Sequence, residues 1–93
     1  MLNKVKLALR VTTDAFDSEI SDLIDAACAD LGIVGVNAST IMNDSLIIRA
    51  VITYCRIHFG EPEDYDRLKK SYDEQKAQLV TATGYTNWGD ANV

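Results

Sequence analysis

Residues 44–59, DSLIIRAVITYCRIHF, would be apolar on nearly every side of an α-helix. The interruptions are Ser45, His58 and a narrow polar edge at spacings of four and three, formed by Arg49, Thr53 and Arg56. A helix that is hydrophobic almost all round lies in the middle of a domain and packs against several partners. Asp44 is a favourable N-cap for it, and Gly60 is a favourable stop. The stretch therefore predicts a buried central helix.

Helical periodicity also dominates the residues before this helix. A short helix is predicted over residues 3–10, with Asn3 as its cap. A longer one begins at a cap on Asp17 and ends at Gly32, which is expected to adopt the left-handed conformation. Its core stripe follows the i, i+3, i+4, i+7 rule and consists of Ile20, Leu23, Ile24, Ala27, Cys28 and Leu31. Residues 32–43 form the connection to the central helix.

Residues 58–70, HFGEPEDYDRLKK, contain the single histidine and the single proline of the chain. One interpretation is a metal or acid–base site built from His58, Glu61, Asp64 and Asp66. Transition-metal sites usually need several His or Cys ligands, however, and these carboxylates lack the spacing of a calcium loop. The favoured interpretation is a helix–helix joint, in which Pro62 starts the next helix and the acids lie near its positive dipole end. We therefore predict no metal and no cofactor.

The helix after this joint carries a seam with spacings of 3, 4, 3 and 4. The seam consists of Tyr65, Leu68, Tyr72, Gln75 and Leu79. It is suited to packing on the central helix or on another subunit. Basic residues lie outside the seam, and Gly84 is expected to close the helix. The prediction is thus one all-α domain, a compact bundle of four or five helices over residues 1–84, followed by a tail over 85–93 that is disordered until bound.

The chain has 93 residues and a net charge of −5, which is unevenly distributed. Three cations lie in residues 1–12, whereas residues 13–44 hold seven carboxylates and no Lys or Arg. Such a field does not attract nucleic-acid phosphates, which need clustered Lys and Arg. A helix-turn-helix reader is disfavoured too, because it needs a short turn and a basic recognition helix. No P-loop, GxGxxG, HExxH or GxSxG motif is present, so an enzyme is not expected.

Cys28 and Cys55 lie among apolar neighbours and are predicted to be buried reduced thiols, with a disulfide or a metal pair as the alternatives. No apolar run reaches the ~20 residues of a membrane span, and the N-terminus does not resemble a signal peptide. A cytoplasmic origin and no contact with membranes are therefore expected. A domain of this size has a thin core, which makes self-association a reasonable expectation.

Two long segments resemble the small head–tail connector proteins of long-tailed bacteriophages and prophages, a family of adaptor or head-completion proteins active in DNA packaging. The segments are VKLALRVTTDAFDSEISDLIDAACADLGI (5–33) and LIIRAVITYCRIHFGEPEDYDRLKKSYDEQKAQLVTATGY (46–85). The shared patterns are VK..LR, DxEI..LI.AA..D, A...Y...HFG and YxxLxxSYxxxKxxL. They are helix-packing signatures and carry no catalytic residue.

The resemblance implies a structural protein that forms a ring, expected to be twelve-fold, beneath the portal protein. The ring would extend the DNA exit channel and offer a platform to the next head-completion or tail protein. DNA would pass through it without specific binding. The protein would reside at the head–tail junction of the virion, and in the host cytoplasm during assembly.

A ring needs two different complementary surfaces on each subunit. The candidates for these surfaces are the acids Glu19, Asp22 and Asp25 of one helix and, facing them on the next subunit, the lysines Lys69, Lys70 and Lys76 of the last helix. The three acids could face a neighbouring subunit or line the channel, and both placements stay open. Tyr85 and Trp88 belong to residue types enriched at interface hot spots, so they are candidates for docking on the portal or a neighbour, unless they fold back on their own domain.

A rival interpretation is a free-standing acidic module that binds a basic protein groove as a DNA mimic would. It predicts a monomer or a dimer, whereas the connector interpretation predicts self-assembly and association with a portal.

Overall fold

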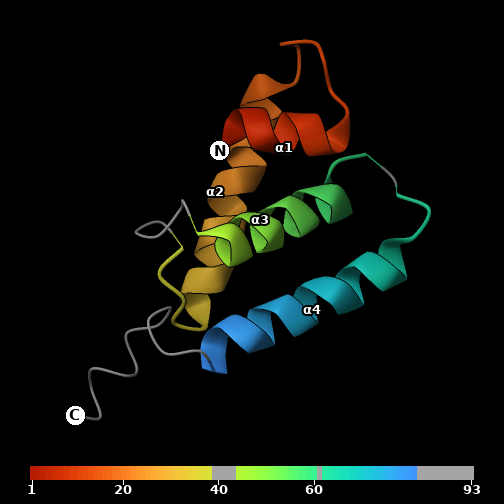
Figure 1. Ribbon diagram of the computed structural model, residues 1–93. Coiled ribbons are helices and arrows are strands. Elements are labelled where there is room, and N and C mark those ends of the chain that lie inside the picture. The colour runs from red at the N-terminus through yellow and green to blue at the C-terminus, as the bar shows by residue number, and fades with distance from the viewer. Residues whose placement is uncertain (39–43, 61, 82–93) are drawn as a thin grey trace.

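The computed structural model describes residues 1–38, 44–60 and 62–81, and over these residues the chain is all-α. The four helices are α1 (Leu2–Leu9), α2 (Asp17–Ile33), α3 (Ser45–His58) and α4 (Tyr65–Thr81). The predicted bundle of helices is therefore confirmed, with four members (Figure 1). No described helix has both the length and the apolar character needed to cross a membrane.

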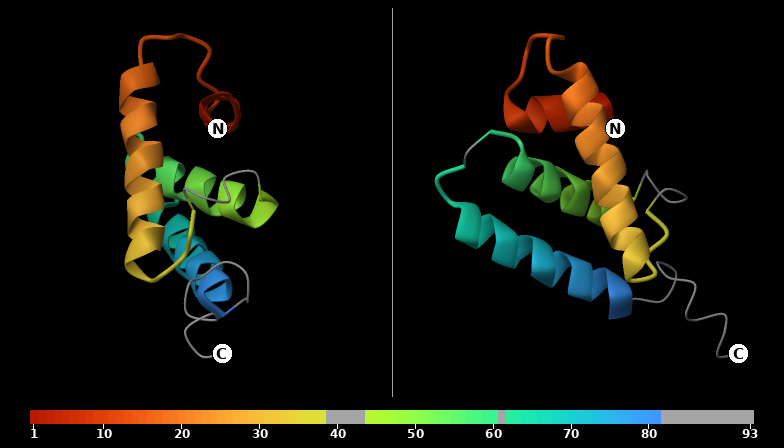
Figure 2. Two further views of the ribbon diagram at one scale, coloured as in Figure 1. Left: turned by 90° about the vertical axis from the view of Figure 1, so that its left-hand side faces the viewer. Right: turned by 180° about the vertical axis from the view of Figure 1, so that it is seen from behind.

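The most apolar helix is central, as predicted. α3 contacts each of the other three helices, and its buried residues are Ile47, Ala50, Val51, Thr53, Cys55 and Ile57. α2 lies along one side of the molecule, with α1, α3 and α4 all on the same side of it (Figure 2). One face of α2 is therefore covered by the bundle and the opposite face is open to solvent.

The N-terminal helix is anchored to the start of α2 by Lys6. Its ammonium group lies 3.1 Å from a carboxylate oxygen of Asp14 and 2.7 Å from one of Asp17. The predicted caps of these two helices are wrong. Asn3 lies inside α1, which begins at Leu2, and Asp17 is the first residue of α2, whose N-cap position is held by Phe16. The Asp17 carboxylate binds the cation of α1 instead of the backbone of its own helix.

The end of α2 also differs from the prediction. Gly32 is helical, and the helix continues to Ile33. The left-handed conformation falls three residues later, at Gly35, which has a φ of 90°. There the chain turns back, and the amide of Val36 donates to the carbonyl of Leu31 over 3.0 Å. The buried side chain of Val36 makes this turn part of the core, so packing of the following loop sets the helix end.

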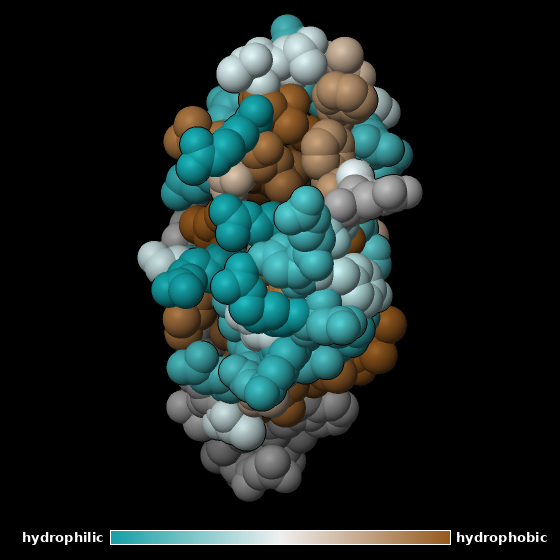
Figure 3. Space-filling model, turned by 90° about the vertical axis from the view of Figure 1, so that its right-hand side faces the viewer, coloured by the Kyte–Doolittle hydropathy of each residue, from teal (hydrophilic) through white to brown (hydrophobic). Residues whose placement is uncertain are grey.

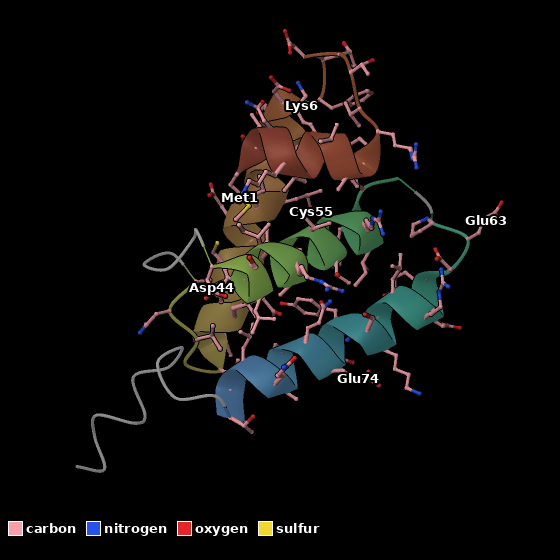
Figure 4. The ribbon with its side chains drawn as sticks, in the orientation of Figure 1. Met1, Lys6, Asp44, Cys55, Glu63 and Glu74 are labelled. Atoms are coloured by element: carbon pink, nitrogen blue, oxygen red, sulfur yellow. The ribbon has the colours of Figure 1, made fainter. Side chains whose placement is uncertain are left out.

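At the start of α3 the prediction is confirmed. A carboxylate oxygen of Asp44 accepts a hydrogen bond of 2.9 Å from the amide of Leu46. Gly60, just beyond the helix, has a φ of 74°, as suits the residue that ends it. Figure 4 places Asp44 at this end of α3 and Glu63 in the connection to α4.

The fourth helix begins later than predicted. It starts at Tyr65, three residues after Pro62, and its first backbone hydrogen bond joins the amide of Leu68 to the carbonyl of Asp64 over 3.0 Å. The Asp64 side chain also pairs with Arg67 in the first turn, which favours a start next to Asp64. Gly84, the predicted stop, lies outside the described residues.

The seam of α4 packs on α3 as expected. Tyr72 and Leu79 are buried, while Leu68 and Gln75 are half-buried. Only Tyr65, at the start of the helix, is 46% exposed. Both cysteines are free thiols. Cys55 is fully buried as predicted, whereas Cys28 is only half-buried.

Candidate functional site

The open face of α2 carries the predicted acids. Glu19, Asp22 and Asp25 are all exposed. Within residues 1–38, 44–60 and 62–81, none of the three takes part in an ion pair. We call these three residues the acidic surface. Its charge is not neutralised by the described part of its own chain, so it is available to a partner.

Asp30, near the C-terminal end of α2, has a different role from these three acids. One of its carboxylate oxygens accepts a hydrogen bond of 2.5 Å from the Tyr72 hydroxyl and lies 3.2 Å from the Lys76 ammonium. Burial alone would raise the pKa of Asp30, but the hydrogen bonds from Tyr72 and Lys76 outweigh it, and the pKa is lowered. Burial, followed by the bond to Asp30, raises the pKa of Tyr72. This cluster joins α2 to α4 within one chain.

The predicted basic residues of α4 are mostly neutralised inside the chain. Lys69 reaches both carboxylate oxygens of Asp73, at 3.1 and 3.3 Å, and Lys76 is held by Asp30. Lys70 is exposed and has no carboxylate partner in the described part of the chain. The structure therefore leaves one of the three lysines with a charge that no carboxylate of the described chain neutralises.

The polar edge of α3 contains one buried residue and two exposed residues. Thr53 is buried, and its hydroxyl donates to the backbone carbonyl of Arg49 over 2.9 Å. Arg49 and Arg56 remain exposed, and no carboxylate among the described residues forms an ion pair with either. A guanidinium nitrogen of Arg56 lies 3.4 Å from the carbonyl of Ala8, at the end of α1. These two arginines were not predicted as site residues, although their spacing of seven places them on one face of a helix.

Two hollows flank these arginines. The first, of about 230 Å³, is lined by Ala8, Leu9, Arg56, Pro62, Asp64 and Leu68. The second, of about 160 Å³, is lined by Leu46, Arg49, Gln75, Gln78 and Leu79. We call the arginine face of α3 together with the two hollows the α3 groove. Besides α3, the lining comes from α1, α4 and the connection before α4, and none of it comes from α2.

Apolar side chains are exposed at several other places. Leu7 in α1 and Ile33 at the end of α2 are each 80% exposed. Phe16 is also exposed, although its ring meets that of Phe59 edge-on at 5.5 Å. Figure 3 shows an apolar area in the upper half of the end view, bordered by hydrophilic surface. Single exposed apolar side chains are ordinary on a protein surface, whereas large contiguous apolar patches mark contacts with other proteins.

In the joint after α3, two described residues of the alternative metal site contact other side chains. His58 packs against Tyr54 at 4.3 Å between ring centroids, and Asp64 pairs with Arg67. Among the described residues, no group of three His, Cys, Asp or Glu side chains is arranged to hold a metal ion. Glu61, Tyr85 and Trp88 lie outside the described residues, so the predicted docking role of the two aromatics stays a prediction.

Comparison with protein families gives a match to a family described as "Phage connector protein", whose model covers residues 1–86. Neither the curated proteins nor the solved structures contain a match. The match spans all four helices and both surfaces described above.

Proposed function

The chain belongs to the phage connector protein family, and we propose that copies of it form a ring beneath the portal that joins the phage head to its tail. Membership makes it a structural, non-enzymatic kind of protein, a component of the virion that contacts other head or tail proteins. The ring, its expected twelve-fold symmetry and its extension of the DNA exit channel are the parts that we add.

The observation that carries this proposal is the family match over residues 1–86, which includes every helix of the fold. The surface chemistry supports it. A ring is built by a heterologous contact, in which two different patches of each subunit meet. This chain has an acidic surface on α2 and exposed arginines on α3, and neither set is neutralised by the described part of its own chain.

The acidic surface would also suit the lining of the DNA channel. Glu19, Asp22 and Asp25 facing the channel would repel DNA phosphates, so that DNA would slide through without being held. The predicted pairing of this surface with the lysines of α4 is limited by the structure, because Lys69 and Lys76 already bind carboxylates. Lys70 is the α4 lysine that we keep as a candidate for a subunit contact.

For attachment to the portal we propose the tail over residues 85–93, with Tyr85 and Trp88 as its anchors. Aromatic side chains of this kind bury a large area on docking. A chain that lacks residues 85–93 is expected to keep its helix content and its unfolding midpoint, and to lose binding to the portal. The matched variant is Tyr85→Ala with Trp88→Ala in the full chain. Unchanged portal binding by both variants would remove the tail from the proposal.

The ring itself is tested by electron microscopy of the concentrated protein, alone and mixed with portal. Rings in either sample support the proposal, and the symmetry of the ring on the portal is then counted directly. The rival acidic module predicts a monomer or a dimer in both samples, together with salt-sensitive binding to a basic protein. Absence of rings in both samples, combined with absence of the protein from purified phage particles, would contradict the connector role.

A further inference from the structure

The surfaces of the chain point to a specific contact between copies. We propose that α2 of one copy packs over the α3 groove of the next, so that Asp22 and Asp25 face Arg49 and Arg56. This inference rests on the proposed ring and names the subunit contact that builds it. It also selects the subunit contact, and not the channel, as the place of the acidic surface.

The cations of the described chain differ in whether a carboxylate of the same chain pairs with them. Four of the basic side chains bind carboxylates of their own chain: Lys6, Arg67, Lys69 and Lys76. The two exposed arginines of α3 do not, although the charge of Arg56 contributes at longer range to the lowered pKa of Asp64. They lie two helical turns apart, about 10.5 Å along the axis, and form a stripe of positive charge. Lys4, Arg10 and Lys70 are exposed as well, but they lie on other helices or turns.

The acidic surface and the α3 groove lie on different sides of the chain. The buried stripe of α2 faces the bundle, so Asp22 and Asp25 point to the other side of that helix. The arginine face of α3 is bounded by residues of α1 and α4 and by none of α2. One chain therefore cannot bring its two surfaces together, whereas a second copy can. Repetition of such a contact is head-to-tail and closes into a ring if the rotation permits.

The lengths of the two charged stripes agree. Glu19 and Asp25 are six residues apart in α2, which corresponds to about 9 Å along the axis. The arginine stripe of about 10.5 Å is therefore similar in length to the acidic surface, in which Asp22 lies between Glu19 and Asp25. Exposed ion pairs contribute little affinity each, so we assign to them the orientation and register of the contact.

Apolar and polar groups at the same surfaces supply the rest of the contact. On α2, Ile33 is 80% exposed, and Ala29 and Gly32 are exposed and small, which allows a close approach of another backbone. In the α3 groove, the buried side-chain carbonyl oxygen of Gln75 has no hydrogen-bond partner among the described residues. Leu46, 37% exposed, lies in the same hollow. A packed neighbour would cover the apolar groups and could satisfy the amide.

The test uses two full-length variants with reversed charges. The acid variant is Asp22→Arg with Asp25→Arg, and the arginine variant is Arg49→Asp with Arg56→Asp. Self-association is measured by sedimentation over a concentration series at low ionic strength. Each variant alone is expected to associate at least about tenfold more weakly than the wild type, because like charges then face each other. An equimolar mixture is expected to recover association, since every contact between the two variants again pairs opposite charges.

The control variant is Glu63→Arg with Glu74→Arg, which reverses two exposed acids away from both surfaces, one in the connection to α4 and one on the side of α4 away from α3 (Figure 4). It is expected to associate as the wild type does. Thermal unfolding of every variant checks that the bundle is intact. Arg49→Asp alone replaces the arginine variant if loss of the Arg56 contact with Ala8 lowers the unfolding midpoint. Ile33→Ser is a further variant that keeps all charges and is expected to weaken association.

Several outcomes would overturn the contact. They are a wild type that stays monomeric at millimolar concentration and forms no ring on the portal, variants that associate as the wild type does, and a mixture that fails to recover. A chain without residues 85–93 that loses association, with no further effect of the arginine variant, would assign the α3 groove to the tail. Rings formed on the portal by either charge-reversal variant would contradict the contact and leave the proposed connector function intact.

Discussion

The carboxylate of Asp30, near the end of α2, accepts a hydrogen bond of 2.5 Å from the hydroxyl of Tyr72 in the middle of α4. The two residues are 42 positions apart in the sequence. Lys76, one turn further along α4, lies 3.2 Å from the same oxygen and 5.1 Å from the centre of the Tyr72 ring. This contact fixes the end of α2 against α4 and thereby sets the direction in which the acidic surface points.

Removal of the Tyr72 hydroxyl tests this contact. Tyr72→Phe keeps the buried ring and its edge-on contact with Tyr54 at 5.5 Å, but it deletes the donor to Asp30. A hydrogen bond to a charged group contributes about 1.5–3 kcal/mol, and partial exposure of Asp30 reduces this to about 1–2 kcal/mol. Urea unfolding measures the loss. Tyr65→Phe, at the exposed start of α4, is the control, and an equal effect of both substitutions would contradict the assignment.

The carboxylate of Asp30 is also expected to make the free energy of unfolding depend on pH. The pKa of Asp30 in the folded state is lowered from its ordinary value of 3.8. Its contribution to the free energy of unfolding is therefore complete above pH 3.8 and is lost as the pH falls through the lower folded pKa. Asp30→Asn is expected to be less stable at neutral pH and to lose less stability on acidification. Urea unfolding over this pH range measures both effects. Asp22→Asn is the matched control, and an acid profile of Asp30→Asn identical to that of the wild type would refute this role.

The central position of α3 makes its core side chains sensitive to truncation. Ile47 has no exposed surface, and Ile47→Ala is expected to lower the free energy of unfolding by about 2–5 kcal/mol. Ile33→Ala removes the same atoms at a site that is 80% exposed, so the free energy of unfolding of the monomer should change by no more than about 0.5 kcal/mol. Chemical denaturation at low protein concentration compares the two. Similar losses would mean that Ile33 is buried in the monomer.

The N-cap of α3 can be tested by substitution of its acceptor, Asp44. Asp44→Ala is expected to cost about 1 kcal/mol of stability, because the amide of Leu46 loses its acceptor. Asn is nearly as good a cap as Asp, so Asp44→Asn should retain most of the stability. Thermal and urea unfolding give both values. If the Asn variant lost as much as the Ala variant, the charge of Asp44 and not its cap would be the stabilising feature.

The features predicted correctly from the sequence depend on residues close together in the chain. The run over residues 44–59 identifies the central helix because its hydrophobic surface is continuous. Asp44 is recognised as a cap because the amide that it accepts from lies two residues away. The seam of α4 follows from its 3, 4 spacing for the same reason.

The predictions that fail depend on residues far apart. Asp17 looks like a cap, yet its carboxylate binds Lys6 of another helix. Gly32 looks like a helix stop, yet the left-handed turn falls on Gly35, where Val36 enters the core. A helix boundary set by tertiary packing leaves little local signal.

For the candidate surfaces too, predictions from nearby residues are correct, and those that depend on distant residues are not. Exposure of Glu19, Asp22 and Asp25 follows from their place off the core stripe and is confirmed. Asp30 also lies off the core stripe of α2, but it is half-buried and pairs with Tyr72 and Lys76. This pairing needs the end of α2 to lie against α4, which no spacing within either helix shows. The arginines of α3 stand out only once the pairing of the other cations is known.

The buried thiol of Cys55 can report how often the helix bundle opens. Burial raises the pKa of its thiol to about 12, and its side chain has no exposed surface. The thiolate is the nucleophile that attacks an alkylating reagent, so Cys55 is modified only in molecules whose bundle has transiently opened. The rate at which Cys55 is modified therefore measures the frequency of opening, and no residue has to be introduced for the experiment. A subunit locked between two neighbours should open less often, so slower labelling of Cys55 would report incorporation into a larger particle.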